Sequence, residues 1–249
     1  MIEREMQGHV AVVRMKHGKA NAFDLEFCEG LSRAFEEVRA SAAHGVVLTG
    51  DGAIFSAGVD LKRLLAAGSA YVERFLPAMS ATLERVFLFP RPVVAAINGH
   101  AIAGGCLLAA CADRRFLAAG PVKVGVPELR VGLTFPAAGL EALRTVVPHS
   151  RLQDLIYGGR TFTGDEAVRF GLADEIVDPA ELLARAVAEA GRLGAFGEAF
   201  RATKEQIRQP ARQFLTANAQ RIDHHGLDVW RRPATLDAVR RYVEATFNK

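Results

Sequence analysis

The stretch AINGHAIAGGCLLAACAD, residues 96–113, passes from an apolar strand-like run into an apolar helix-like run through three glycines. The β-branched residues at 93–98 favour a buried strand, and CLLAACA at 106–112 favours a buried helix. Glycine lets a ligand or a second chain segment approach the main chain closely. We therefore expect residues 99–105 to form a strand-to-helix junction whose backbone is open to a ligand, as at the strand ends of α/β proteins.

The length and composition are those of an ordinary globular protein. A chain of 249 residues can bury a sizeable core within one α/β domain. The net charge of +3 is too small to favour a nucleic-acid partner. The charged first ten residues do not resemble a signal peptide, and no apolar run approaches the ~20 residues of a membrane span. We expect a cytoplasmic protein with no nucleic-acid or membrane partner.

The cysteines and histidines do not predict a metal site. Cys28, Cys106 and Cys111 are odd in number and lack the spacing of metal ligands, so reduced thiols are the simplest interpretation. The pair at residues 224–225 has no partner cluster. A thiol nucleophile at Cys106 is the less favoured alternative. His100 is the one histidine in this stretch that could activate the thiol, and packing is the favoured role of His100.

Hydrophobic periodicity predicts alternating strands and helices in the first half of the chain. The expected strands cover residues 9–15, 45–50, 93–98 and 114–119, and the expected helices cover 25–42, 71–89 and 106–112. Asp24 is placed to cap the first helix. Strands separated by helices of this length indicate crossover connections and a mainly parallel sheet.

From Phe135 onward helices dominate the pattern. They are expected at residues 137–147, 150–157, 165–170, 179–193 and from 198 to the end, with one short strand in ADEIV at 173–177. No linker, repeat or low-complexity tract separates this half from the first. We interpret it as a helical extension of one domain, whose apolar faces need a covering such as a partner subunit.

A second junction, FSAGVDL at residues 55–61, has the same design as the glycine-rich one. Each follows an expected buried strand and leads into an expected helix, where N–H groups are free and negative charge is favoured. Two such junctions can direct two amides at one carbonyl oxygen, and each donor stabilises an oxyanion or enolate by roughly 3–4 kcal/mol. The alternative is that both segments are only tight turns that need positive φ.

Together with KANAFD (19–24), VGVPELRVGL (124–133), FTGDEAVRFGLADEIV (162–177) and RATKEQIR (201–208), these segments resemble the crotonase, or enoyl-CoA hydratase/isomerase, family. The resemblance covers nearly the whole chain, with the motifs in the same order. It implies an α/β fold in which residues 1–195 form a spiral of ββα repeats. It also implies that residues 196–249 form a helical region that mediates trimerisation, and trimers of the family often pair into hexamers.

The resemblance also implies an acyl-CoA thioester as ligand, with the backbone N–H groups of Val59 and Gly104 as its oxyanion hole. The residues expected near the CoA moiety are Lys19, Ala20, Ala57, Asp60, Leu61 and Lys62. Of these, the two lysines are candidates for the CoA phosphates, and Asp60 is expected mainly to cap the helix that begins near Leu61. No metal and no cofactor beyond the CoA of the substrate is implied.

The acid and base positions separate the possible reactions. Hydratases of this family use two glutamates; Leu107 stands at the first position and Glu128 at the second. Leucine can neither orient water nor deliver a proton. Moving a β,γ double bond to the α,β position needs only one carboxylate, and an apolar neighbour excludes water and raises the carboxyl pKa. We therefore expect an isomerase with Glu128 as proton shuttle.

Three alternatives stay open: a hydratase-like enzyme, another reaction of the family such as decarboxylation or thioester hydrolysis, and a non-catalytic acyl-CoA-binding protein. Phe135 and the apolar residues after it are candidates to line the acyl pocket. Asp113 is expected to make structural hydrogen bonds.

Overall fold

The computed structural model describes residues 1–247, and it confirms an α/β fold with a helical C-terminal region. The chain begins with β1 (Ile2–Gln7), β2 (Val10–Met15) and α1 (Leu25–Ala40). Three strand–strand–helix units follow: β3 (Gly45–Gly50), β4 (Ile54–Ser56) and α2 (Leu61–Phe87); β5 (Val93–Ile97), β6 (His100–Ile102) and α3 (Gly104–Ala110); and β7 (Arg114–Ala118), β8 (Val124–Gly125) and the 3-10 helix η1 (Glu128–Val131).

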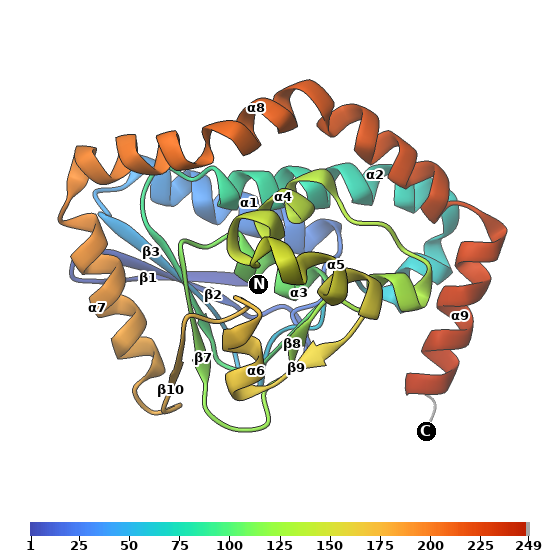
Figure 1. Ribbon diagram of the computed structural model, residues 1–249, viewed down its shortest axis with the longest axis horizontal. Helices are drawn as coiled ribbons and strands as arrows, with labels where there is room; N and C mark the ends of the chain where they lie inside the picture. The colour runs from blue at the N-terminus through green and yellow to red at the C-terminus, as the bar shows by residue number, and fades with distance from the viewer. Residues whose placement is uncertain (248–249) are drawn as a thin grey trace.

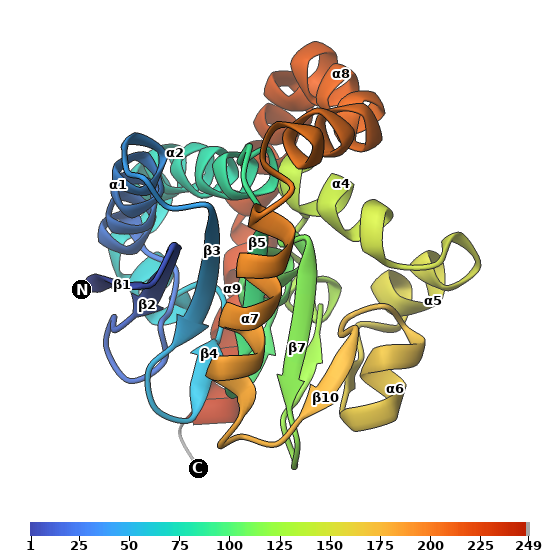
Figure 2. The same cartoon turned by 90° about the vertical axis from the view of Figure 1, so that its left-hand side faces the viewer.

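The two strands of each unit enter different sheets. The first strands join a six-stranded sheet in the order β1-β2-β3-β5-β7-β10, where β10 is Glu175–Val177. It is parallel except for the β1–β2 pair, as expected (Figure 2). The second strands join a smaller sheet, β4-β6-β8-β9, where β9 is Thr161–Phe162. Because β4, β6 and β8 run parallel, the segments that follow them lie at one edge.

Two features of the first half differ from the sequence prediction. β1 and the whole smaller sheet were not predicted, because β1 is a mostly exposed edge strand and strands of two or three residues are too short for a periodic pattern. Hydrophobic periodicity predicted a helix only at residues 71–89, whereas α2 begins at Leu61, which confirms the separate expectation of a helix start capped by Asp60. Its start is capped by Asp60, which accepts a hydrogen bond from the Arg63 N–H at 2.9 Å. Gly68, at φ +70°, interrupts its periodicity.

The second half contributes α4 (Ala137–Val146), α5 (His149–Gly158), α6 (Gly164–Arg169), α7 (Leu182–Gly194), α8 (Gly197–Trp230) and α9 (Pro233–Phe247). The long α8 runs across one side of the molecule over α2 and α4, and α9 turns back at its end (Figure 1). The sequence predicted one helix from residue 198 onward. The chain instead breaks after Trp230 and restarts at Pro233, whose missing N–H is tolerated at a helix start.

Buried charges attach α8 to the core. Asp113, which follows α3, accepts hydrogen bonds from Lys204 at 2.6 Å, from Arg208 at 2.8 Å and from the backbone N–H of Val93 at 2.8 Å. Arg208 also donates to the carbonyl of Phe87 at the end of α2. The expected structural role of Asp113 is confirmed, and so is the cap of α1, in which Asp24 accepts from the Phe27 N–H.

No helix within residues 1–247 is both long and apolar enough to cross a membrane.

Candidate active site

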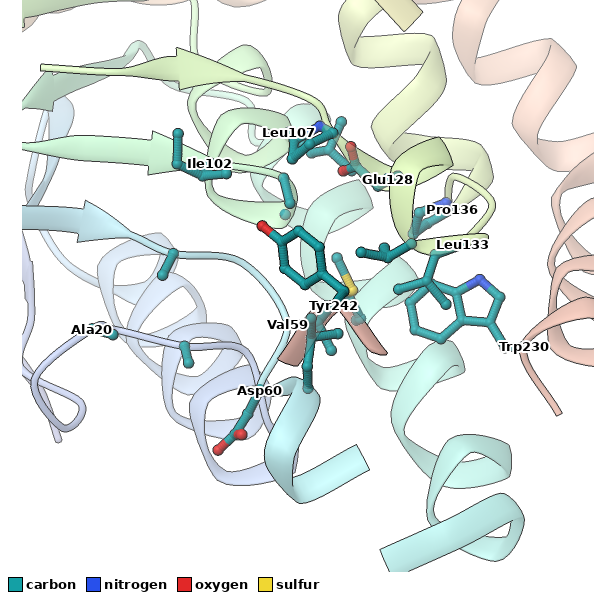
Figure 3. Close-up of a pocket in the computed structure, with 18 of the residues that line it drawn as sticks. Ala20, Val59, Asp60, Ile102, Leu107, Glu128, Leu133, Pro136, Trp230 and Tyr242 are labelled. Carbon is teal, nitrogen blue, oxygen red and sulfur yellow. The ribbon is translucent and has the colours of Figure 1, made fainter. Parts of the chain in front are cut away.

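A cavity of about 310 Å³ lies beyond the common edge of β4, β6 and β8 (Figure 3). It brings together most of the residues that the sequence singled out. These are Ala20, Ala57, Val59, Asp60, Leu61, Lys62, Gly104, Leu107 and Glu128. Lys19 is the exception, because it is exposed and lies outside the lining. The resulting site combines main-chain segments from three consecutive strand–strand–helix units.

The amide of Val59 faces away from the main chain that flanks it. The N–H of Phe23 donates to the carbonyl of Gly58 at 2.8 Å, and the carbonyl of Phe23 accepts from the N–H of Asp60 at 3.0 Å. In such a parallel bridge the residue between the two bonded ones directs its own N–H to the opposite side. Within residues 1–247 this N–H has no hydrogen-bond partner, and Val59 lines the cavity.

The amide of Gly104 lies beside this segment. Gly104 opens α3, so its N–H has no partner within the helix. A Cβ added to Gly58 would lie 3.0 Å from the nitrogen of Gly104 and 2.8 Å from the Cβ of Ala103. The two junctions are therefore in contact. The tight-turn alternative holds in part, because Gly58 adopts φ +81°, but the free amides and the shared cavity go beyond what a turn requires.

Glu128 supplies a buried carboxyl group with no counter-charge. Glu128 is the first residue of η1 and is 6% exposed. Neither oxygen of its carboxyl group has a hydrogen-bond partner among the described residues. Burial raises the pKa of Glu128 to about 8. The turn after it is held by the N–H of Leu133, which donates to the Glu128 carbonyl at 3.1 Å. A carboxyl that titrates near neutral pH in an apolar cavity is suited to proton transfer.

Leu107 faces the same cavity from α3. It is fully buried, and a Cβ added to Gly139 on α4 would lie 2.8 Å from its Cδ1 atom, so α4 is close-packed against it. The other carboxylate of the cavity wall is Asp60, which caps α2 near the mouth. Among the described residues, Glu128 is thus the one carboxyl group directed into the interior of the cavity (Figure 3).

The C-terminal helices provide residues that the sequence analysis missed. Trp230 at the end of α8 and Tyr242 on α9 both line the cavity, and the indole N–H of Trp230 donates to the Thr134 hydroxyl at 3.0 Å. The stretch VWRRPATLDAVRRYVE at residues 229–244 contains both residues and resembles the isomerase branch of the family, but that resemblance assigned neither of them to the site. Their place in the site depends on the return of α9 across the molecule (Figure 1).

Phe135 is not part of this lining, contrary to expectation. Its neighbours Leu133, Thr134 and Pro136 face the cavity, whereas Phe135 lines a separate one beside α4 and α5. Phe135 faces the other side although its neighbours Thr134 and Pro136 both line the cavity, so composition could not place this single aromatic residue.

The alternative nucleophile is not supported. Cys106 is buried outside the cavity lining, and burial raises the pKa of its thiol, which keeps it protonated. The ring Nδ1 of His100 accepts a hydrogen bond from the backbone N–H of Lys123 at 3.0 Å, a structural contact. Among the described residues, no three histidine, cysteine or acidic side chains are grouped so as to hold a metal ion.

The sequence is similar to a known family and to several characterised proteins. A family model described as enoyl-CoA hydratase/isomerase matches residues 5–230. The carnitinyl-CoA dehydratase of Salmonella arizonae is 34% identical over 71% of this chain and 67% of its own length. The short-chain-enoyl-CoA hydratase of Clostridium acetobutylicum is 32% identical over 72% of this chain and 69% of its own.

Solved structures give the same fold. The crystal structure of human mitochondrial delta3-delta2-enoyl-CoA isomerase superposes with a TM-score of 0.92 at 26% identity, covering 98% of this chain and 97% of that one. The similar proteins thus carry the names of hydratases, dehydratases and isomerases, and the reaction has to be argued from the residues of the cavity.

Proposed function

Because the chain belongs to the enoyl-CoA hydratase/isomerase family, we propose that it acts on acyl-CoA thioesters and moves a β,γ double bond to the α,β position. One observation carries the choice of reaction. Among the described residues, Glu128 is the unpaired carboxyl group in the interior of a mainly apolar cavity, which the segments of Val59 and Gly104 also line.

In the proposed reaction the thioester oxygen accepts hydrogen bonds from the N–H groups of Val59 and Gly104. The Glu128 carboxylate removes a proton from C2, and the electron pair of the C2–H bond is delocalised into the carbonyl to form a dienolate. The two amides stabilise the negative charge on oxygen. The same carboxyl group then delivers the proton to C4, which leaves the double bond between C2 and C3 and regenerates the carboxylate.

Leu107 supports isomerisation over hydration. Adding water needs a group that orients the water and a group that supplies a proton, and Leu107 occupies the wall where a second carboxylate would be needed. Hydration remains the second candidate, because several similar proteins are named hydratases. Decarboxylation, thioester hydrolysis and acyl-CoA binding without turnover are the other candidate functions.

The CoA moiety is proposed to lie along the mouth of the cavity, near Ala20, Ala57, Asp60, Leu61 and Lys62. Lys19 is exposed and directly precedes Ala20 in the sequence, so it remains a candidate for a phosphate contact. The reaction requires no cofactor beyond the CoA of the substrate. A cytoplasmic location and a homotrimer or hexamer remain predictions.

The test measures the isomerisation of 3-hexenoyl-CoA through the absorbance of the conjugated thioester that is formed. We expect Glu128→Gln to lower kcat by about 10³, the order contributed by a general base. The matched control is Glu141→Gln: Glu141 is also buried, but it lies on α4 outside the cavity lining, so activity should be retained. Unchanged turnover in Glu128→Gln would reject the assignment, and rapid hydration of crotonyl-CoA by the wild type would favour the hydratase.

A further inference from the structure

Tyr242 reaches the cavity from the helix farthest along the chain. It is partly buried, and its ring projects into the space between Val59 and the wall that bears Leu133 and Trp230 (Figure 3). The buried residues Thr235, Val239 and Val243 hold α9 against the core. α9 packs on α2 and on η1, the element that carries Glu128. The ring is therefore held in place by the fold.

The hydroxyl of Tyr242 has no hydrogen-bond partner within residues 1–247, whereas the polar groups of two buried aromatic residues do. The indole N–H of Trp230 is bonded to Thr134, and the hydroxyl of Tyr71 accepts from the N–H of Leu25 at 3.3 Å. Tyr242 is only partly buried and lines the cavity, so its hydroxyl can be reached from within it. This hydroxyl is thus available to a ligand.

The direction of the Tyr242 hydroxyl indicates which group of a bound ligand it would contact. It points toward the side of Ile102, two residues before Gly104, and away from Trp230 and Leu133 (Figure 3). It is not bonded to Glu128, since both oxygens of that carboxyl group lack a partner. The ligand group expected on this side is the thioester oxygen at the amides of Gly104 and Val59.

We propose that Tyr242 is a further catalytic residue, whose hydroxyl donates a third hydrogen bond to the thioester oxygen. The inference rests on the oxyanion site of the proposed function. It makes the C-terminal helix a part of the catalytic apparatus: two donors come from the strand-to-helix junctions, and the third arrives only when α9 is folded back. An enolate oxygen carries enough charge to accept all three bonds.

The test uses Tyr242→Phe in the full chain, which removes the hydroxyl and keeps the ring. A chromophoric aryl-enoyl-CoA is bound, and its absorption moves to longer wavelength as its carbonyl group is polarised. We expect a smaller shift in the variant than in the wild type. With 3-hexenoyl-CoA we expect kcat to fall roughly tenfold or more, with KM altered far less, because the bond strengthens as charge develops.

The matched control is Tyr157→Phe, which removes a hydroxyl from an exposed tyrosine of α5 outside the active-site lining and should leave both readouts unchanged. A wild-type spectral shift in Tyr242→Phe overturns the proposal whatever its rate. A wild type that polarises the chromophore but does not isomerise 3-hexenoyl-CoA rejects the proposed reaction and leaves the role of Tyr242 standing. A wild type that binds the chromophore without any shift rejects the oxyanion site and this proposal together.

Discussion

The proposed proton transfer depends on a single carboxyl group, that of Glu128. Its two oxygens are buried without a partner, and desolvation raises its pKa to about 8 from an ordinary 4.5. The folded protein therefore binds this proton more tightly than the unfolded chain does. The stability contributed by this group is present below about pH 4.5 and is lost as the pH rises toward about 8. At neutral pH the burial of Glu128 therefore lowers the stability of the fold, which is the cost of holding the proposed base in this cavity.

The pH dependence of the reaction follows from that pKa. Glu128 must be ionised to remove a proton, so kcat/KM should increase with pH and level off above about pH 8. Initial rates of 3-hexenoyl-CoA isomerisation between roughly pH 5 and pH 10 would define the curve. A rate that is already at its plateau at pH 6 would show that the carboxyl group is paired or solvated in the working enzyme.

At the scale of elements, α8 depends on a buried charge cluster. Lys204 and Arg208 are each almost fully buried, and both bond to Asp113. Burial lowers the pKa of Lys204 to about 8, which shows how strongly desolvation opposes its charge. The cluster joins α8 to the end of α3, and α3 carries Gly104 at its other end and Leu107 in its middle.

Removing the carboxylate of Asp113, which Lys204 and Arg208 share, should weaken the attachment of α8 to the core. We expect Asp113→Ala to lower the free energy of unfolding by about 3–5 kcal/mol, because two buried cations lose their partner. The control is Glu198→Ala on the same helix, whose pair with Arg201 is exposed and should contribute less than about 1 kcal/mol. Urea unfolding of both variants measures the difference, and equal losses would contradict a role for the buried cluster.

At the scale of the whole molecule, the repeated units explain how distant segments meet. Each unit sends its second strand into the smaller sheet, so the residues after β4, β6 and β8 share one edge. This places Val59, Gly104 and Glu128 around a single cavity although they span 70 positions of the sequence. α8 and α9 then cover the opposite wall with Trp230 and Tyr242.

The outer face of the C-terminal region predicts the assembly. Phe196, Ile207 and Phe214, at and along α8, are 55%, 67% and 37% exposed. Large apolar side chains on one long helix favour burial against a second copy of the chain. We expect a mass of three or six chains by light scattering, and a shift toward monomer in Ile207→Glu. A monomeric wild type would contradict the expected trimer or hexamer.

The sequence by itself determined the alternation of strands and helices and the mainly parallel sheet, because periodicity, capping residues and glycines at junctions act at short range. Asp24 and Asp60 lie at helix starts for the same reason, since a cap acts within one turn. The expected roles of Val59, Gly104 and Glu128, and the significance of Leu107, came instead from the resemblance to the family.

Only the tertiary structure decided how these parts form a site. The strands of the smaller sheet have two or three residues and carry no periodic pattern, and their pairing is what brings the junctions together. The orientation of Phe135, the return of α9 with Tyr242 and the isolation of the Glu128 carboxyl all depend on contacts between residues far apart in the chain. Burial and desolvation are properties of the whole packed molecule, so no local stretch of sequence contains them.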